Sequence, residues 1–160
     1  MPSSCGTCMG FTPCPFSLVS TNIRGQAGSA VLIEDTAVYF NALNGLPGPY
    51  IKSFLTSLGS EKLHLVLAGF SDKTAEAVST IAYCSGPGCD PVLFQGRIRG
   101  AIVPARGKLE YGWQACFEDL DSGKTLAEMT DGEKHEMSHL RKALQQFITW
   151  HSQGTKDGSD

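Results

Sequence analysis

Two long segments near the middle of the chain, 75–84 and 92–103, constrain the fold more than any other feature. In both, apolar and polar residues alternate with the period of two that is typical of a half-buried β-strand. Glycine and proline are frequent between the two segments, and a second turn follows at 104–107. We therefore predict an antiparallel hairpin with a generous loop, and with it a fold built on a sheet.

Helical spacing dominates the C-terminal part of the chain. Thr130 followed by Glu133 forms a capping box, in which each side chain satisfies a backbone donor at the start of a helix. We predict one helix over 131–151. Its apolar stripe consists of Met137, Leu140, Leu144, Phe147 and Ile148, and its polar face carries Lys134, Ser138 and Arg141.

Shorter elements are expected in the first half of the chain. Residues 45–49 consist of two glycines, two prolines and Leu46. We predict a rigid loop there, whose prolines have no N–H to donate to the backbone hydrogen bonds of a sheet. One helix is expected from about Tyr50 and another over 61–67.

The length of 160 residues is enough for one domain with a hydrophobic core and too short for two comfortable ones. Residues 1–29 are rich in Ser, Thr, Gly, Pro and Cys with weak periodicity, which predicts an irregular leader. We assign the folded domain to 30–151 and a flexible tail to 152–160.

The charge balance limits the classes of partner. Thirteen Lys and Arg against sixteen Asp and Glu give a formal net charge of −3, without the basic excess that binds a nucleic-acid backbone. No stretch approaches the ~20 apolar residues of a membrane span. The first 20 residues contain no Lys or Arg, and so lack the charged region of a secretory signal. We expect a cytoplasmic protein with neither polymeric nucleic acid nor a membrane as partner.

Six cysteines are present, and their spacing is unlike the disulfide framework of a small secreted domain, so we expect reduced thiols. Cys5 and Cys8 have the spacing of a redox or zinc pair. No strand pattern precedes them and no matching second pair follows, so a thiol-bearing irregular leader is the favoured interpretation.

The candidate carboxylates follow an apolar run at 31–33. We predict that this run is a buried strand that ends on Glu34 and Asp35, followed by the Thr36 hydroxyl. Hard oxygen ligands of this kind can hold a magnesium ion bound to phosphates. Solvated turn residues would give the same pattern.

Cationic and aromatic residues could complete such a site. Tyr111, Gly112 and Trp113 offer two aromatic faces around a glycine, suited either to stacking on a purine or to a buried core. The cations that could neutralise phosphate oxygens are Lys52, Arg99, Arg106 and Lys134.

Residues 135–139 match the HExxH pattern of zinc metalloproteases. On one continuous helix His135 and His139 could share a face and bind zinc, with Glu136 as general base. Because only His151 follows as a later histidine and no third-ligand motif is present, we treat this as a remote alternative.

Read consecutively, the segments from Val31 onward strongly resemble the eukaryotic inosine triphosphate pyrophosphatases, within the inosine/xanthosine triphosphate pyrophosphatase family. The resemblance extends from Ala30 to Trp150. It is carried, in order, by 31–36, 40–52, 54–55, 67–70, 94–97, 102–104, 106–107, 111–113, 127–129, 133–134 and 138–139.

The resemblance implies an α/β fold of two lobes on a long mixed sheet, with the nucleotide in the cleft between the lobes and usually a homodimer. It also implies hydrolysis of ITP, dITP or XTP to the monophosphate and pyrophosphate. The family uses Mg²⁺, with Mn²⁺ as a possible substitute, and an activated water.

Carried over by position, the resemblance implies that Asp35 is the metal-linked carboxylate and base, with Glu34 beside it as a second metal ligand. The other implied contacts are of two kinds. Substrate and phosphate contacts fall to Thr36, Lys52 and Lys134, and base contacts to Tyr111, Gly112, Trp113, Gln114, Ser138 and His139.

The chain departs from the family pattern at three places. The N-terminal strand, the Gly-Asn-Lys phosphate loop and a further metal-binding Glu are not recognisable before Ala30. Gln114 stands where relatives have an acid, and Leu140 where they have an Arg. The alternative is therefore a catalytically impaired member that acts as a nucleotide-binding or dimerisation partner.

Overall fold

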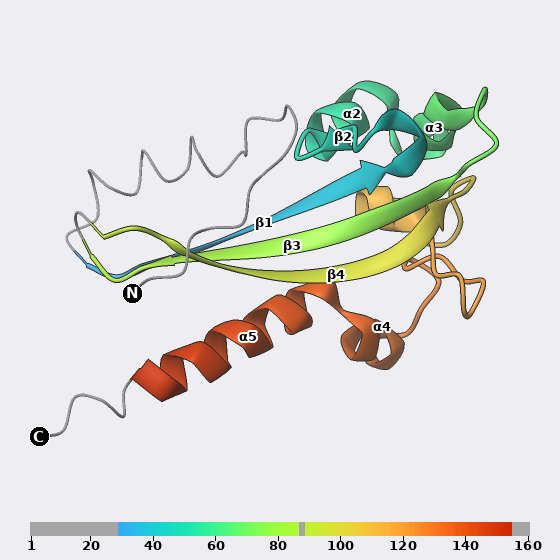
Figure 1. Ribbon diagram of the computed structural model, residues 1–160. Helices are drawn as coiled ribbons and strands as arrows, with labels where there is room; N and C mark the ends of the chain where they lie inside the picture. The colour runs from blue at the N-terminus through green and yellow to red at the C-terminus, as the bar shows by residue number, and fades with distance from the viewer. Residues whose placement is uncertain (1–28, 87–88, 155–160) are drawn as a thin grey trace, which may run out of the picture.

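The computed structural model describes residues 29–86 and 89–154 and forms one open five-stranded sheet with helices packed against it (Figure 1). The strand order is β2-β1-β3-β4-β5, and every pairing among the described strands is antiparallel. The α/β class is confirmed, whereas a mixed sheet was expected. In chain order the strands are β1 (Val31–Phe40), β2 (Pro47–Gly48), β3 (Thr74–Cys84), β4 (Val92–Ile102) and β5 (Phe117–Glu118).

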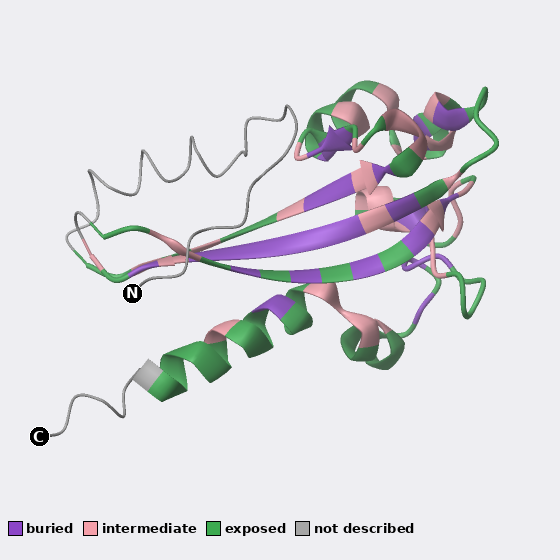
Figure 2. Cartoon of the chain, in the orientation of Figure 1, coloured by how far each residue is buried: buried purple, intermediate pink, exposed green. Residues whose placement is uncertain are grey.

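The predicted hairpin is confirmed as β3 and β4, which pair from Thr74 with Ala101 to Tyr83 with Val92. Along β4 the even-numbered residues from Phe94 to Ile102 are buried and most of the odd-numbered ones are exposed. This alternation follows from the two-residue period of a strand. β3 lies between β1 and β4 and is buried along most of its length (Figure 2).

The helices fall in three groups. α2 (Ile51–Leu58) begins where a helix was predicted, and the 61–67 segment divides into α3 (Ser60–Leu63) and the 3-10 turn η2 (His64–Leu67). Two further 3-10 segments precede β2 and β5, and two α-helices end the described chain. These are η1 (Asn41–Leu43), η3 (Leu109–Ala115), α4 (Asp131–Met137) and α5 (His139–Gly154).

The predicted end of the first strand was wrong. β1 continues to Phe40, so Glu34 and Asp35 lie inside the strand and not at its C-terminal end. The continuation buries Val38 and Phe40 completely in the core, which stabilises the extended backbone beyond the two carboxylates. The proline-containing loop also pairs: Gly48 lies opposite Val38 at the sheet edge, where proline next to it is tolerated.

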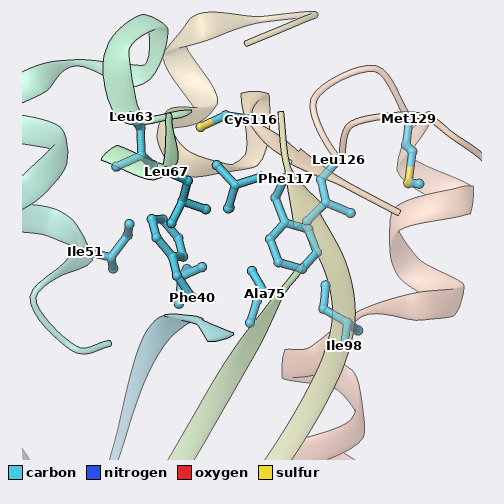
Figure 3. Packing of buried hydrophobic residues seen from close by; sticks show 13 residues of the cluster. Phe40, Ile51, Leu63, Leu67, Ala75, Ile98, Cys116, Phe117, Leu126 and Met129 are labelled. Carbon is cyan, nitrogen blue, oxygen red and sulfur yellow. The ribbon is translucent and has the colours of Figure 1, made fainter. Parts of the chain in front are cut away.

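Two apolar clusters cover one face of the sheet, at opposite ends of the long strands. The larger one lies beneath α2, α3 and η2, and Figure 3 shows Phe40 beside Leu67, with Phe117 as a further member of the cluster. The smaller cluster joins Ile81 and Phe94 to Ala143 of α5. The stretch between the clusters carries Glu34, Thr36 and Ser79, so polar groups separate two apolar ends.

The predicted single C-terminal helix is two helices. The Thr130 and Glu133 capping box is confirmed at the start of α4. The chain then leaves helical geometry at Ser138, whose ψ is 120°, and its Oγ accepts from the backbone N–H of Arg141 at 3.1 Å. Ser138 thus caps a new helix, and Lys134 and Arg141 belong to different helices.

Only part of the predicted apolar stripe, Met137 and Phe147, packs against the apolar clusters. The helix α5 contacts β3 and β4 through Ala143 and Phe147. Its backbone approaches Gly96 so closely that a Cβ there would lie 1.8 Å from the His139 carbonyl oxygen. The close approach sets the rotation of the helix, which leaves 41–49% of Leu140, Leu144 and Ile148 exposed.

No helix within the described ranges is long and apolar enough to cross a membrane.

Candidate functional site

The two carboxylates of β1 lie on opposite faces of the sheet. Successive strand residues alternate between faces, and Glu34 pairs with Ile81, which contacts the α5 side. Glu34 is fixed there by the Thr36 hydroxyl, which donates to its Oε1 at 2.8 Å. Glu34 and Thr36 therefore point to the face that carries both apolar clusters.

Asp35 points to the other face, opposite Thr80 in the register. Partial burial, followed by the negative charge of Glu34, raises the pKa of Asp35, while a hydrogen bond from the Thr36 backbone opposes the shift. A carboxylate with a raised pKa accepts a proton more readily near neutral pH, as a general base must.

The outer edge of β1 is where both carboxylates could meet one ligand. β2 pairs only with Val38 and Tyr39, so from Val31 to Ala37 this edge has no strand partner within the described chain. A ligand lying along the edge can be contacted by Glu34 from one face and by Asp35 from the other. Neither face presents both carboxylates together.

Among residues 29–86 and 89–154 no group of three or more His, Cys, Asp or Glu could hold a metal ion. Mg²⁺ usually keeps several waters and is held by one or two carboxylates together with substrate phosphates. The oxygens of Glu34 and Thr36 fit that kind of ligation. Glu34 and Asp35 do not fit as a chelating pair on one face, because the strand directs them apart.

A small hollow of about 120 Å³ lies between α4, α5, η3 and β4. Complete small-molecule sites measure about 300–1,000 Å³, so this hollow suits the edge of a ring and not a whole nucleotide. Its apolar lining residues, here called the floor, are Ile98, Leu126 and Met137, and its polar ones, here called the rim, are Gln114, Lys134, Ser138 and His139.

Three polar side chains at the hollow, those of Gln114, Lys134 and His139, make no hydrogen bond with another side chain or backbone group in the described part of the chain. Lys134 instead lies 4.1 Å from the centre of the Tyr111 ring. His139 packs edge-on against Trp113 with ring centres 5.6 Å apart. Unpaired polar groups that converge on one hollow leave donors for a ligand.

Electrostatics connect this hollow to β1. Burial lowers the pKa of His139, and the positive charge of Lys142 acts in the same direction, whereas the carboxylate of Glu34 opposes both. Burial therefore favours the neutral imidazole, which presents one donor and one acceptor. Because the Glu34 charge acts on His139, the face of β1 that carries Glu34 and the hollow form one electrostatic neighbourhood.

Gly112 gives η3 the bend that places Tyr111 and Trp113. Its φ of 61° and ψ of −125° interrupt the 3-10 geometry. A Cβ at Gly112 would lie 3.4 Å from Leu55, which shows that η3 packs against α2. Lys52 of the same helix is exposed and forms no ion pair with another described residue, so no contact places it at the site.

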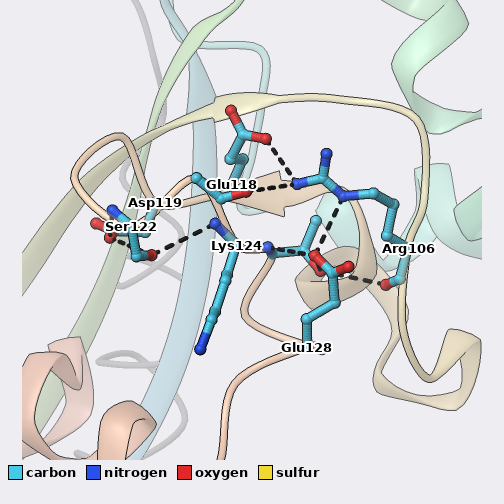
Figure 4. A network of polar contacts seen from close by, with 8 residues as sticks. Arg106, Glu118, Asp119, Ser122, Lys124 and Glu128 are labelled. Carbon is cyan, nitrogen blue, oxygen red and sulfur yellow. Dashed lines mark hydrogen bonds and ion pairs between the residues drawn. The ribbon is translucent and has the colours of Figure 1, made fainter.

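Both arginines that were expected to bind phosphate, Arg99 and Arg106, instead form ion pairs with glutamates. Arg106 donates to Glu118 at 2.6 Å and to Glu128 at 3.1 Å in the network of Figure 4, and the bond with Glu118 raises its pKa. Arg99 pairs with Glu76 at 3.0 Å on the face opposite the hollow. Both act as structural cations.

The zinc-protease alternative loses its geometry because the helix breaks at Ser138. His135 lies exposed on α4, while His139 is partly buried as the first residue of α5. The one-face arrangement of two histidines four residues apart is therefore absent from 135–139.

Two features of the surroundings carried no signal in the sequence. Ser79 is fully buried and hydrogen-bonds Thr36, although it resembles any small residue of an alternating strand. A larger hollow of about 850 Å³ runs beside α5 and the free edge of β4, where Lys142 and Gln146 bond the carbonyls of Arg97 and Gln95. None of the residues predicted for the nucleotide site lines this hollow.

Comparison with known proteins agrees with the fold. The Ham1 family matches residues 18–150. Two inosine triphosphate pyrophosphatases are similar: that of Phaeosphaeria nodorum is 54% identical over 139 residues, 84% of this chain and 73% of that protein. That of Aspergillus oryzae is 51% identical over 123 residues, 77% of this chain and 64% of that protein. The solved structure of a HAM1 protein from Coxiella burnetii superposes with a TM-score of 0.75 at 25% identity, covering 85% of this chain and 74% of that one.

Proposed function

Because the chain belongs to the Ham1 family, we propose that it hydrolyses deaminated purine nucleoside triphosphates to the monophosphate and pyrophosphate. The substrates proposed are ITP, dITP and XTP, whose removal prevents their incorporation into nucleic acids. Two inosine triphosphate pyrophosphatases are 54% and 51% identical in sequence to this chain, over 84% and 77% of its length. We further propose that the protein acts as a homodimer.

The observation that carries this proposal is the set of unpaired polar groups around the small hollow. Gln114, Lys134 and His139 surround an apolar floor and are flanked by the rings of Tyr111 and Trp113. A flat base with a carbonyl at its edge matches that chemistry, because its ring contacts the apolar floor and its oxygen accepts from the rim.

The reacting phosphates would lie along the free edge of β1. Asp35, with its raised pKa, would take the proton of the attacking water, while Glu34 and Thr36 would contact the substrate from the opposite face of the sheet. Lys134 and Lys52 would supply positive charge to phosphate oxygens. A bound divalent cation, Mg²⁺ or Mn²⁺, would neutralise phosphate charge there, and Glu34 is the residue best placed to hold it.

The test is steady-state release of pyrophosphate from ITP, XTP and ATP by the full chain with Mg²⁺. We expect turnover of ITP and XTP in preference to ATP. Asp35→Asn should lower kcat by about 10²-fold or more if Asp35 is the base. Glu61→Gln, an exposed acid on α3, is the matched control and should retain wild-type rates.

A second candidate is nucleotide binding without turnover, favoured by the divergence of Glu34 and Asp35. Calorimetric binding of IMP together with no pyrophosphate release from any of the three triphosphates would support that function and exclude catalysis. Absence of both binding and turnover would exclude the two candidates together.

A further inference from the structure

A buried hydroxyl interrupts the apolar face of β3. Ser79 is fully buried between Ala77, which belongs to the larger cluster, and Ile81, which belongs to the smaller one. A buried hydroxyl without a hydrogen bond is costly, and an apolar side chain here would join the two clusters. The buried Ser79 hydroxyl therefore needs a hydrogen-bond partner.

The partner of Ser79 is Thr36, the residue directly opposite on β1, with the two hydroxyl oxygens 2.8 Å apart. Thr36 also donates to the Glu34 carboxylate at 2.8 Å. A threonine hydroxyl has one proton, and an ionised carboxylate can only accept. Because Thr36 donates its proton to Glu34, Ser79 must be the donor and the Thr36 oxygen the acceptor in the bond between them.

The three side chains thus form a directional chain of hydrogen bonds, from Ser79 through Thr36 to Glu34. Each bond polarises the next, so the donation to Glu34 is stronger when Thr36 itself accepts. The buried end is held by the sheet, since Ser79 lies on the central strand between β1 and β4. The exposed end is the carboxylate that acts on His139.

We propose that Ser79 is a positioning residue, which orients the Glu34 carboxylate on the α5 face of the sheet through the Thr36 hydroxyl. This inference rests on the proposed function for its catalytic consequence. The hydrogen-bond chain itself can be tested without turnover.

The first experiment measures thermal unfolding of Ser79→Ala, Glu34→Ala and the double variant. Among the described residues, hydrogen bonds link Ser79 to Glu34 only through Thr36, so we expect their losses in Tm to be non-additive by about 2 °C or more. In a Thr36→Val background the same cycle should become additive. Additivity in the wild-type background would overturn the proposal, whatever the activity of the chain.

The second experiment separates kcat from KM for ITP. Ser79→Ala and Thr36→Val should each lower kcat by about 3–10-fold, and the double variant should be no worse than Thr36→Val. Thr36→Ser keeps the hydroxyl and should restore most of the rate. Thr74→Val removes a hydroxyl at the other end of β3, which bonds Asp72 away from the candidate site, and should leave kcat unchanged.

The outcomes distinguish the two proposals. If wild-type protein releases no pyrophosphate, the proposed function fails and the positioning role fails with it, even where the thermal cycle shows coupling. If the wild type is active and coupled but Ser79→Ala retains its full kcat, only the positioning role is overturned. An equal loss of kcat in Thr74→Val would likewise assign the effect to general disturbance of the strand.

Discussion

The direction of single side chains decides what the candidate site can do. Glu34 and Asp35 are neighbours in sequence, yet the strand places them on opposite faces and gives them different surroundings. Glu34 is held by Thr36 and acts on His139, whereas Asp35 is partly buried and has a raised pKa. Two similar residues can therefore serve different roles in one reaction.

Gly112 is a second position where one residue determines the site. Its backbone conformation is one that residues with a Cβ rarely adopt, so Gly112→Ala should destabilise the protein by about 1–3 kcal/mol. Urea denaturation followed by circular dichroism measures the loss. Gly132→Ala, in α4 with open space around it, is the control and should be neutral or stabilising by up to about 1 kcal/mol. Equal stability of the two variants would contradict the strained bend.

At the scale of elements, α4 and α5 are set by their N-terminal caps and by what they pack against. Thr130 and Glu133 start α4, Ser138 starts α5, and Gly96 allows the α5 backbone to approach β4. The break between the helices turns His139 inward toward Trp113 and leaves His135 in solvent. Helix ends thus position the residues around the hollow.

The capping carboxylate of α4 predicts a pH dependence. The Lys124 side chain, followed by the Thr130 backbone, lowers the pKa of Glu133 from 4.5 to about 2. A lowered pKa stabilises the fold fully above the ordinary value, and this contribution is lost as the pH falls from about 5 to about 2. Glu133→Gln should therefore have a lower Tm than the wild type at neutral pH. Its Tm should also fall less than that of the wild type as the pH is lowered.

Thermal unfolding at pH 7, 5 and 3 checks this expectation. Glu136→Gln, one turn along the same helix and exposed, should keep the pH profile of the wild type. A profile of Glu133→Gln parallel to the wild type over the acid range would show that this carboxylate does not carry the effect.

At the scale of the whole molecule, the sheet is open, and the helix α5 that packs on it exposes part of its own apolar surface to solvent. On α5 the exposed residues Leu140, Leu144 and Ile148 are spaced four apart and so form one stripe. Exposed apolar stripes of this kind favour association between proteins. The stripe lies to one side of Ala143, which contacts the sheet.

We expect the wild-type chain to self-associate with increasing concentration, and the triple variant Leu140→Gln, Leu144→Gln, Ile148→Gln to do so less. Sedimentation velocity at several concentrations measures this. Tm should change little, because these side chains contribute little to the core. Gln145→Ala and Gln153→Ala, at polar positions of the same helix, are controls and should behave as the wild type. Unchanged association in the triple variant would exclude the stripe as the contact.

Local patterns in the sequence determined much of this protein. The alternation at 75–84 and 92–103 predicted the β3–β4 hairpin, and the Thr130 and Glu133 pair predicted the start of α4. Both depend on interactions between residues close in sequence or on a simple period, so the chain encodes them without reference to the rest of the fold. The grouping of Tyr111, Trp113, Lys134 and His139 followed from resemblance.

Only the tertiary structure decided where β1 ends, that the last helix breaks at Ser138, and which side of α5 is buried. Burial of Val38 and Phe40 extends the strand past the two carboxylates, and the missing side chain of Gly96 sets the rotation of α5. A contact across 43 positions joined Ser79 to Thr36, and ion pairs across 12 and 22 positions engaged Arg106 with Glu118 and Glu128. A local pattern cannot specify such contacts, because their free energy depends on which distant surfaces the fold brings together.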